Sequence, residues 1–131
     1  MDNIANTLVL LAGLHSLGFA VFHAGFWRML RWSSTLESAG TVNRAVIQVL
    51  NLRLIYVFLG IAALCFFFPH ELAGTTLGRA LLLGMSGFWI GRTIEQFVFF
   101  RSPRNADRPV VNALTVLFAI GAVLFALPVF V

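Results

Sequence analysis

Strongly polar side chains occur inside long apolar stretches of this sequence, where they are costly to keep. They are two histidines, three amides, two arginines and one glutamate: His15, His23, Gln48, Asn51, Arg53, Arg92, Glu95 and Gln96. A charged side chain at the centre of a membrane-spanning helix costs about 2.5–3.5 kcal/mol on insertion scales. Side chains kept at such a cost are candidates for ligand binding or proton transfer.

The spacing of these residues predicts three polar helix faces, because residues three, four or seven apart lie on one side of a helix. The faces are Arg44, Gln48 and Asn51; Trp89, Arg92 and Gln96, with Glu95 three residues after Arg92; and His23 with Trp27. At 1.5 Å of rise per residue, the intramembrane polar groups other than His15 lie roughly 6 to 14 Å from the same membrane face. His15 lies roughly 18 Å in, near the midplane.

Three polar faces at one depth predict a single polar pocket that opens toward the cytoplasm. Its ligand-binding residues would be His23, Arg44, Gln48, Asn51, Arg53, Arg92, Glu95 and Gln96. Two intramembrane arginines against one carboxylate leave a positive site, which favours a small anionic or amphipathic ligand such as a lipid or a quinone. A structural role stays open: Arg53 or Arg92 pairs with Glu95, the amides hydrogen-bond between helices, or the arginines reach the headgroups.

The histidines do not predict a cofactor. Haem ligation by two histidines in a bundle usually takes them from facing helices, whereas His15 and His23 lie in one run and about 80° apart around its axis. We therefore predict no haem, metal site or other cofactor. Proton transfer by His23 near Glu95 stays open, because imidazole titrates near neutral pH. His70 follows Pro69 and is interpreted as a loop residue.

Four apolar runs have to position these residues, namely residues 4–27, 45–68, 77–100 and 110–131. Each run has 22 to 24 residues, and a helix needs about 20 to cross the hydrocarbon core of a bilayer. The short connections make neighbouring helices antiparallel. The sequence therefore predicts an all-α membrane protein, an antiparallel four-transmembrane-helix bundle that forms a single domain over residues 1–131.

The composition agrees with a membrane protein. Of the 131 residues, 60% are hydrophobic and 11% are charged, whereas soluble domains are about 25% charged. The net charge is +4, and all nine basic residues are arginines that lie mostly just outside the apolar runs. That placement suits anionic lipid headgroups rather than nucleic acid. Cys65 is the single cysteine, so no internal disulfide is possible.

The distribution of arginines predicts the orientation in the membrane. The first connection carries Arg28, Arg31 and Arg44, the third carries Arg101, Arg104 and Arg108, and the second carries only Arg79. Basic residues near helix ends favour the cytoplasmic side. We therefore expect a multi-pass protein of the bacterial inner membrane with cytoplasmic first and third connections and both termini in the periplasm.

Gly87 and Gly91 form a Gly-x-x-x-Gly motif, which lets two helices approach closely. The motif is consistent with a homo-oligomer through this face or with close packing inside one chain. A homo-oligomeric channel or transporter, or an accessory subunit of a membrane complex, is therefore a further functional class. Membrane lipids are the other expected partners, whichever class holds.

The chain resembles small, uncharacterised bacterial four-helix inner-membrane proteins. The residues that carry the resemblance are His23-Ala24-Gly25-Phe26-Trp27, Asn43-Arg44, and Phe88-Trp89 through Arg92 with Gln96. The resemblance would cover nearly the whole chain. It implies the four-helix fold and no particular activity.

The start of the second run also resembles the MAPEG family (membrane-associated eicosanoid and glutathione metabolism), whose members are four-helix trimers. Their pattern is Arg-Ala-x-x-Asn-x-x-Glu, and this chain has Arg44-Ala45-Val46-Ile47-Gln48-Val49-Leu50-Asn51. Gln48 and Asn51 depart from the family's Asn and Glu, and the family's upstream glutamate is missing. The turn Arg101-Ser102-Pro103-Arg104 lies roughly where the family has basic residues. The resemblance implies a glutathione- or thiol-dependent membrane transferase that holds glutathione with Arg44, Gln48, Asn51 and Arg92.

Overall fold

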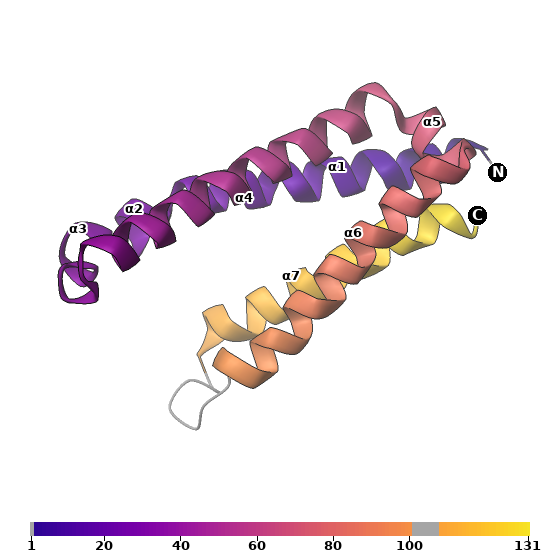
Figure 1. The fold of residues 1–131 in the computed structure, drawn as a ribbon. Helices are drawn as coiled ribbons and strands as arrows, with labels where there is room; N and C mark the ends of the chain where they lie inside the picture. The colour runs from indigo at the N-terminus through magenta and orange to yellow at the C-terminus, as the bar shows by residue number, and fades with distance from the viewer. Residues whose placement is uncertain (1, 101–107) are drawn as a thin grey trace. The chain divides into compact units, whose positions relative to one another are not determined.

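The computed structural model describes residues 2–100 and 108–131, and every regular element within them is helical (Figure 1). This confirms the predicted all-α class. In chain order the elements are α1 (Asp2–Ala24), α2 (Phe26–Met29), α3 (Trp32–Thr35), η1 (Glu37–Ala39), α4 (Thr41–Phe67), α5 (Pro69–Gly74), α6 (Thr76–Glu95), η2 (Gln96–Phe100), α7 (Pro109–Ala126) and η3 (Leu127–Val129). The predicted turn at Arg101 to Arg104, with the two arginines counted for orientation, lies outside the described residues.

Three helical segments within the described residues are long and apolar enough to cross a membrane. They are Asn3–Ala24, Thr41–Phe67 and Pro109–Val129, of 22, 27 and 21 residues. A bilayer core needs about 20 helical residues, so each of the three is sufficient by length. The protein therefore has the helices of a multi-pass membrane protein.

The third predicted span, residues 77–100, corresponds to α6 and η2 and is not one of these three segments. The α-helical part has 20 residues and includes Arg79, Arg92 and Glu95. These charged side chains make α6 less apolar than the other long helices. The predicted four-span bundle consequently rests on α6 crossing the membrane with charged residues near both of its ends.

The first connection is more ordered than the sequence suggests. The first run was expected to continue to residue 27, but α1 ends at Ala24 and the short helix α2 follows Gly25. The second run was expected to begin at residue 45, but α4 begins at Thr41. Just before α4, Gly40 has φ +75°, a conformation that side chains with a Cβ rarely adopt. Glycine therefore allows the chain to turn into α4.

The described chain forms two compact units. The first-hairpin unit is Gly13–Leu64, and the second-hairpin unit is Met1–Ala12 together with Cys65–Val131. The single transmembrane domain predicted over residues 1–131 stays a prediction.

In the first-hairpin unit, the remainder of α1 packs antiparallel to α4 (Figure 1). The ring of Phe58 lies 6.0 Å from that of Phe19 and 5.4 Å from that of His23, measured between centroids. Small buried residues, Ala20 and Ala62, allow the two helices to come together. Small residues at helix contacts are typical of membrane proteins, where association depends on close packing rather than on hydrophobic burial.

In the second-hairpin unit, α6 packs antiparallel to α7 (Figure 1). The hydroxyl of Ser86 donates a hydrogen bond to the carbonyl oxygen of Ala122 at 2.8 Å. One turn further along α6, the ring of Trp89 stacks on that of Phe118 at 5.7 Å. The start of α6 is capped by the side chain of Thr75, which accepts a hydrogen bond from the Gly78 amide at 3.0 Å.

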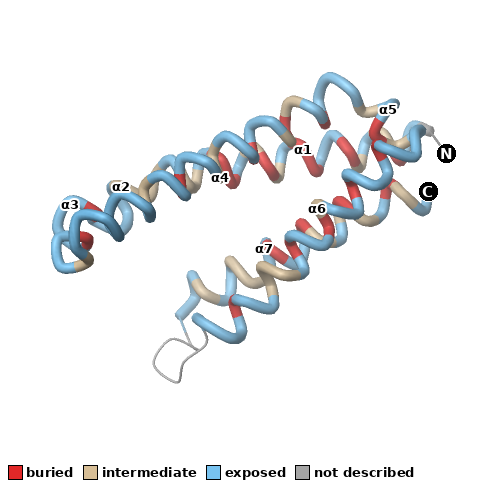
Figure 2. Tube along the Cα trace, in the orientation of Figure 1, coloured by how far each residue is buried: buried red, intermediate tan, exposed pale blue. Residues whose placement is uncertain are grey.

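Much of the length of the long helices is exposed (Figure 2), and the exposed positions include many large apolar side chains. The buried polar side chains of the described residues are Ser16, Asn51, Ser86 and Gln96. Large apolar side chains such as Val21 and Phe67 are exposed along the same helices. Exposed apolar surface of this extent requires an apolar surrounding, which agrees with insertion into a membrane.

The Gly-x-x-x-Gly motif lies on a face of α6 that is open within the second-hairpin unit. A Cβ added at Gly87 or Gly91 would meet no atom of this unit within 4 Å. These two glycines are therefore not needed for the packing of α6 against α5 or α7.

Gly78 is the glycine of α6 that close packing requires. A Cβ at this position would collide with the backbone of Glu71 and Leu72 in α5. Gly78→Ala is expected to lower the free energy of unfolding by about 1–3 kcal/mol, as overpacking does elsewhere. Reversible unfolding of the full chain in mixed detergent micelles measures this.

The matched control is Gly84→Ala on the same helix, where the added Cβ meets nothing within 4 Å. It should leave stability unchanged or raise it slightly, because Ala favours helix by up to about 1 kcal/mol over Gly. Equal unfolding midpoints for the two variants would contradict the close contact between α5 and α6.

Candidate functional site

His23 and Asn51 join α1 to α4 by two hydrogen bonds. The His23 Nδ1 atom lies 2.8 Å from Asn51 Oδ1, and Asn51 Nδ2 donates to the His23 carbonyl oxygen at 3.0 Å. Because an amide oxygen can only accept, His23 Nδ1 must carry the proton. Both polar atoms of the buried Asn51 side chain are thus engaged by one residue. This is the interhelical hydrogen bonding that the sequence left open as a structural role.

One helical turn closer to the first connection, Trp27 and Gln48 make a second link. Trp27 Nε1 donates to Gln48 Oε1 at 3.2 Å, and Gln48 Nε2 donates to the Arg44 carbonyl oxygen at 3.2 Å. The Trp27 ring lies 5.2 Å from that of Trp32 in an edge-to-face arrangement. The two tryptophans and Gln48 therefore form a part-buried aromatic and polar cluster at this end of the first-hairpin unit.

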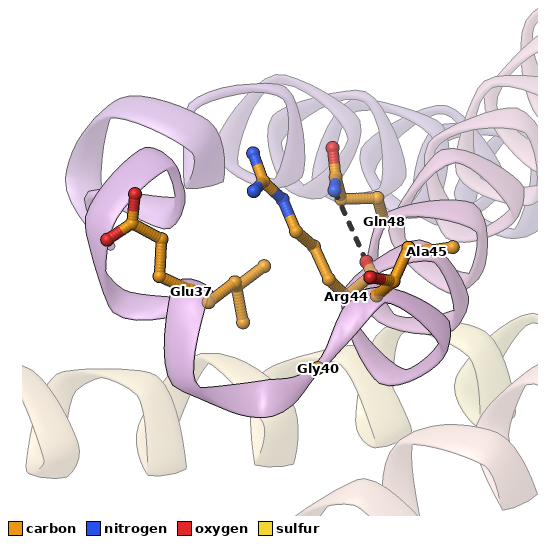
Figure 3. A pocket seen from close by; sticks show the side chains of 7 residues that line it. Glu37, Gly40, Arg44, Ala45 and Gln48 are labelled. Atoms are coloured by element: carbon orange, nitrogen blue, oxygen red, sulfur yellow. Dashed lines mark hydrogen bonds between the residues drawn. The ribbon is translucent and has the colours of Figure 1, made fainter.

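A hollow lies beside this cluster, between the first connection and the start of α4 (Figure 3). Its volume is about 360 Å³, and the residues that line it include Glu37, Gly40, Thr41, Arg44 and Gln48. The Arg44 side chain extends into the space between Glu37 and Gln48 (Figure 3). Within the described residues the Arg44 guanidinium has no hydrogen bond or ion pair. The hollow therefore presents a cation whose N–H donors are available.

Arg53 does not join this group. It lies two residues after Asn51, about 200° further around the helix axis, and its side chain is exposed. The sequence grouped Arg53 with Gln48 and Asn51 by depth alone. The structure does not bring it together with them in the first-hairpin unit.

In α6, Arg92 has partners within its own hairpin. Its Nη1 atom lies 3.7 Å from Glu95 Oε2. Its guanidinium carbon lies 4.6 Å from the ring centroid of Phe118 and 5.2 Å from that of Phe100. Glu95 is largely exposed, so the ion pair is a weak one, and the aromatic faces are the main support of the guanidinium.

Gln96 is almost fully buried between α6 and α7. Its Nε2 atom donates to the Val111 carbonyl oxygen over a long 3.4 Å, and its Oε1 atom has no hydrogen-bond partner in the described part of the chain. Gln96 is also the first residue of η2, a π-helical stretch. Such stretches occur often at functional sites, so Arg92 and Gln96 remain candidates in the second-hairpin unit.

The predicted site residues therefore form two local groups. His23, Arg44, Gln48 and Asn51 gather in the first-hairpin unit, whereas Arg92, Glu95 and Gln96 gather in the second-hairpin unit. His15 is half-buried, and its ring lies 4.9 Å from that of Phe19. Within residues 2–100 and 108–131 no three His, Cys, Asp or Glu side chains are grouped so that they could hold a metal ion.

The interpretation of His70 as a loop residue is wrong. His70 lies in helix α5, and its Nδ1 atom is 2.8 Å from Asn6 Nδ2 of α1. The two residues are 64 positions apart in sequence. No local pattern predicts such a pair.

No family model, curated protein or solved structure matches the chain.

The His23 and Asn51 side chains are expected to stabilise the first hairpin jointly. Asn51→Ala should lower the free energy of unfolding by about 1–3 kcal/mol, because it removes the two hydrogen bonds by which Asn51 joins α4 to His23 of α1. In a double-mutant cycle with His23→Ala, the coupling should be about 1 kcal/mol. Reversible unfolding in mixed micelles provides all four values.

Asn112→Ala is the matched control, since Asn112 is exposed on α7 and makes no side-chain hydrogen bond with the described residues. Additive effects of the two single variants would mean that the side-chain hydrogen bond between His23 and Asn51 contributes nothing to stability.

Proposed function

We propose that this chain is a small multi-pass membrane protein of four spans that binds a small anionic amphipathic ligand at the cytoplasmic end of its first hairpin. A membrane lipid is the ligand that fits the proposal best. The binding element is the hollow at Arg44 and Gln48. The observation that carries the proposal is that the Arg44 guanidinium in this hollow has no partner among the described residues.

The location of the hollow supports an anionic ligand. The first connection, residues 28–44, has three arginines and one glutamate, a net charge of 3 − 1 = +2. By the distribution of arginines, this connection is cytoplasmic, where the leaflet carries anionic lipids. Both termini are then periplasmic, and α6 is the third span. A bacterial inner membrane is the compartment that agrees with this orientation.

The geometry of Arg44 favours a phosphate over a quinone. A guanidinium offers a planar set of N–H donors that matches the oxygens of phosphate or carboxylate. A quinone offers single carbonyl oxygens and would leave most of these donors unused. The volume of about 360 Å³ is at the small end of the range for ligand sites, so it suits a headgroup whose acyl chains lie along the exposed apolar faces.

Arg44→Gln is expected to weaken binding of phosphatidylglycerol about tenfold or more, because it removes charge-assisted hydrogen bonds to the phosphate. Native mass spectrometry of the full chain, released from nanodiscs of phosphatidylcholine and phosphatidylglycerol, measures the lipid retained. Arg108→Gln is the matched control, because it makes the same change of charge at an exposed residue before α7.

Equal retention of phosphatidylglycerol by Arg44→Gln and the parent chain would contradict the proposal. Saturable binding of glutathione that Arg44→Gln abolishes would instead support the transferase implied by the MAPEG resemblance. Retention of a quinone in place of the lipid would mean that the ligand of this site is a quinone.

The open face of α6 supports a second, independent proposal, that copies of this chain associate through Gly87 and Gly91. With Cys65 replaced by Ala, Gly87→Cys should form a disulfide-linked dimer on mild oxidation in membranes, because two such faces can approach closely. Gly18→Cys on α1, which also lies in open space, is the control. Similar yields of dimer for both cysteines would indicate random collisions and exclude a specific contact at Gly87.

A further inference from the structure

A second polar hollow lies in the second-hairpin unit. The residues that line it belong to the start of α1, to α5, to the start of α6 and to the segment from η3 to Val131. Its volume is about 710 Å³, within the usual range for small-molecule sites. The polar residues that line it are Asn3, Asn6, His70 and Arg79, and Pro128 closes one side. They come from α1, from the neighbouring helices α5 and α6, and from η3, which are three separate regions of the sequence, so the fold assembles this hollow.

The hydrogen bond between Asn6 and His70 determines which imidazole nitrogen carries the proton and can donate it to a ligand. Asn6 Nδ2 lies 2.8 Å from His70 Nδ1. An amide nitrogen can only donate, so Nδ1 accepts, and in neutral imidazole the proton is then on Nε2. His70 is exposed, so its Nε2–H is available to an acceptor.

Arg79 is held in place by the chain itself. Its Nη2 atom donates to the Val129 carbonyl oxygen at 2.6 Å. A guanidinium has five N–H donors, and the remaining ones have no partner within the described residues. None of the described residues that line the hollow is Asp or Glu. A cation with unused donors therefore lines a hollow in which the described side chains carry no carboxylate.

We propose that the hollow at Asn6, His70 and Arg79 binds a small oxyanion, either a carboxylate or a phosphate. Arg79 supplies the charge and a forked pair of donors, and the Nε2–H of His70 supplies a further donor from α5. Asn6 orients the imidazole. This site is distinct from the hollow at Arg44, lies on the periplasmic side under the proposed topology, and goes beyond the function proposed above.

Isothermal titration calorimetry of the full chain in uncharged detergent micelles tests the proposal with inorganic phosphate and with succinate at constant ionic strength. Saturable binding of one of them is expected. Arg79→Gln should weaken it about tenfold or more, because a charged hydrogen bond is lost. His70→Ala should weaken it about threefold to tenfold, the loss expected for one weaker hydrogen bond.

If the Arg79→Gln variant does not fold, the His70→Ala variant still tests the proposal. The His70 side chain is exposed and contributes little packing, so this variant is expected to fold. Arg108→Gln serves as the control for a non-specific effect of charge and should change the affinity less than about twofold. Equal weakening by Arg108→Gln and Arg79→Gln would overturn the proposal, as would binding that His70→Ala leaves unchanged.

Nanodiscs distinguish a free oxyanion from a lipid headgroup. If phosphatidylglycerol, but not phosphatidylcholine, shifts the imidazole resonances of His70 while free phosphate and succinate do not bind, the oxyanion is part of a lipid. If neither the free anions nor phosphatidylglycerol affect His70, the site does not bind oxyanions. These results do not depend on Arg44, so this proposal and the proposed function can fail separately.

Discussion

The absence of water around apolar helices is the constraint on which this structure depends. A buried polar group in such a helix needs a partner supplied by the protein. Some hydroxyls find one in the preceding turn, as when Thr115 donates to the Val111 carbonyl oxygen at 2.8 Å, and the Ser86 hydroxyl finds one on the neighbouring helix. Longer side chains find one on the neighbouring helix, as Asn51 does at His23. Each hairpin is consequently joined at the places where its sequence departs from apolar residues.

The sequence was sufficient to predict the helical class and the extent of most long helices. Runs of more than 20 apolar residues leave few alternatives to a helix when charged residues are rare. The polar face of the second run was also predictable, because Arg44, Gln48 and Asn51 have helical spacing and lie on one side of α4. The ends of helices were less predictable. Gly40, with φ +75° just before α4, determines one of them through a backbone conformation that apolar periodicity does not record.

The partners of the polar residues could not be predicted. The depth of a residue along a helix follows from its number, but its angular position around the helix axis decides which residues meet. Arg53 was therefore grouped with Asn51 by depth, although Asn51 is buried and Arg53 is exposed. Hydrogen bonds such as those between Trp27 and Gln48, or Asn6 and His70, join residues 21 and 64 positions apart. Such pairs depend on how helices pack, and no local pattern contains that information.

The completeness of the first hairpin has a consequence for biosynthesis. Residues 13–64 contain both members of the links between His23 and Asn51 and between Trp27 and Gln48. A nascent chain that has delivered these residues to the translocon already holds both partners of these two links. The pair of helices is therefore able to enter lipid as one body, joined before α6 and α7 are complete.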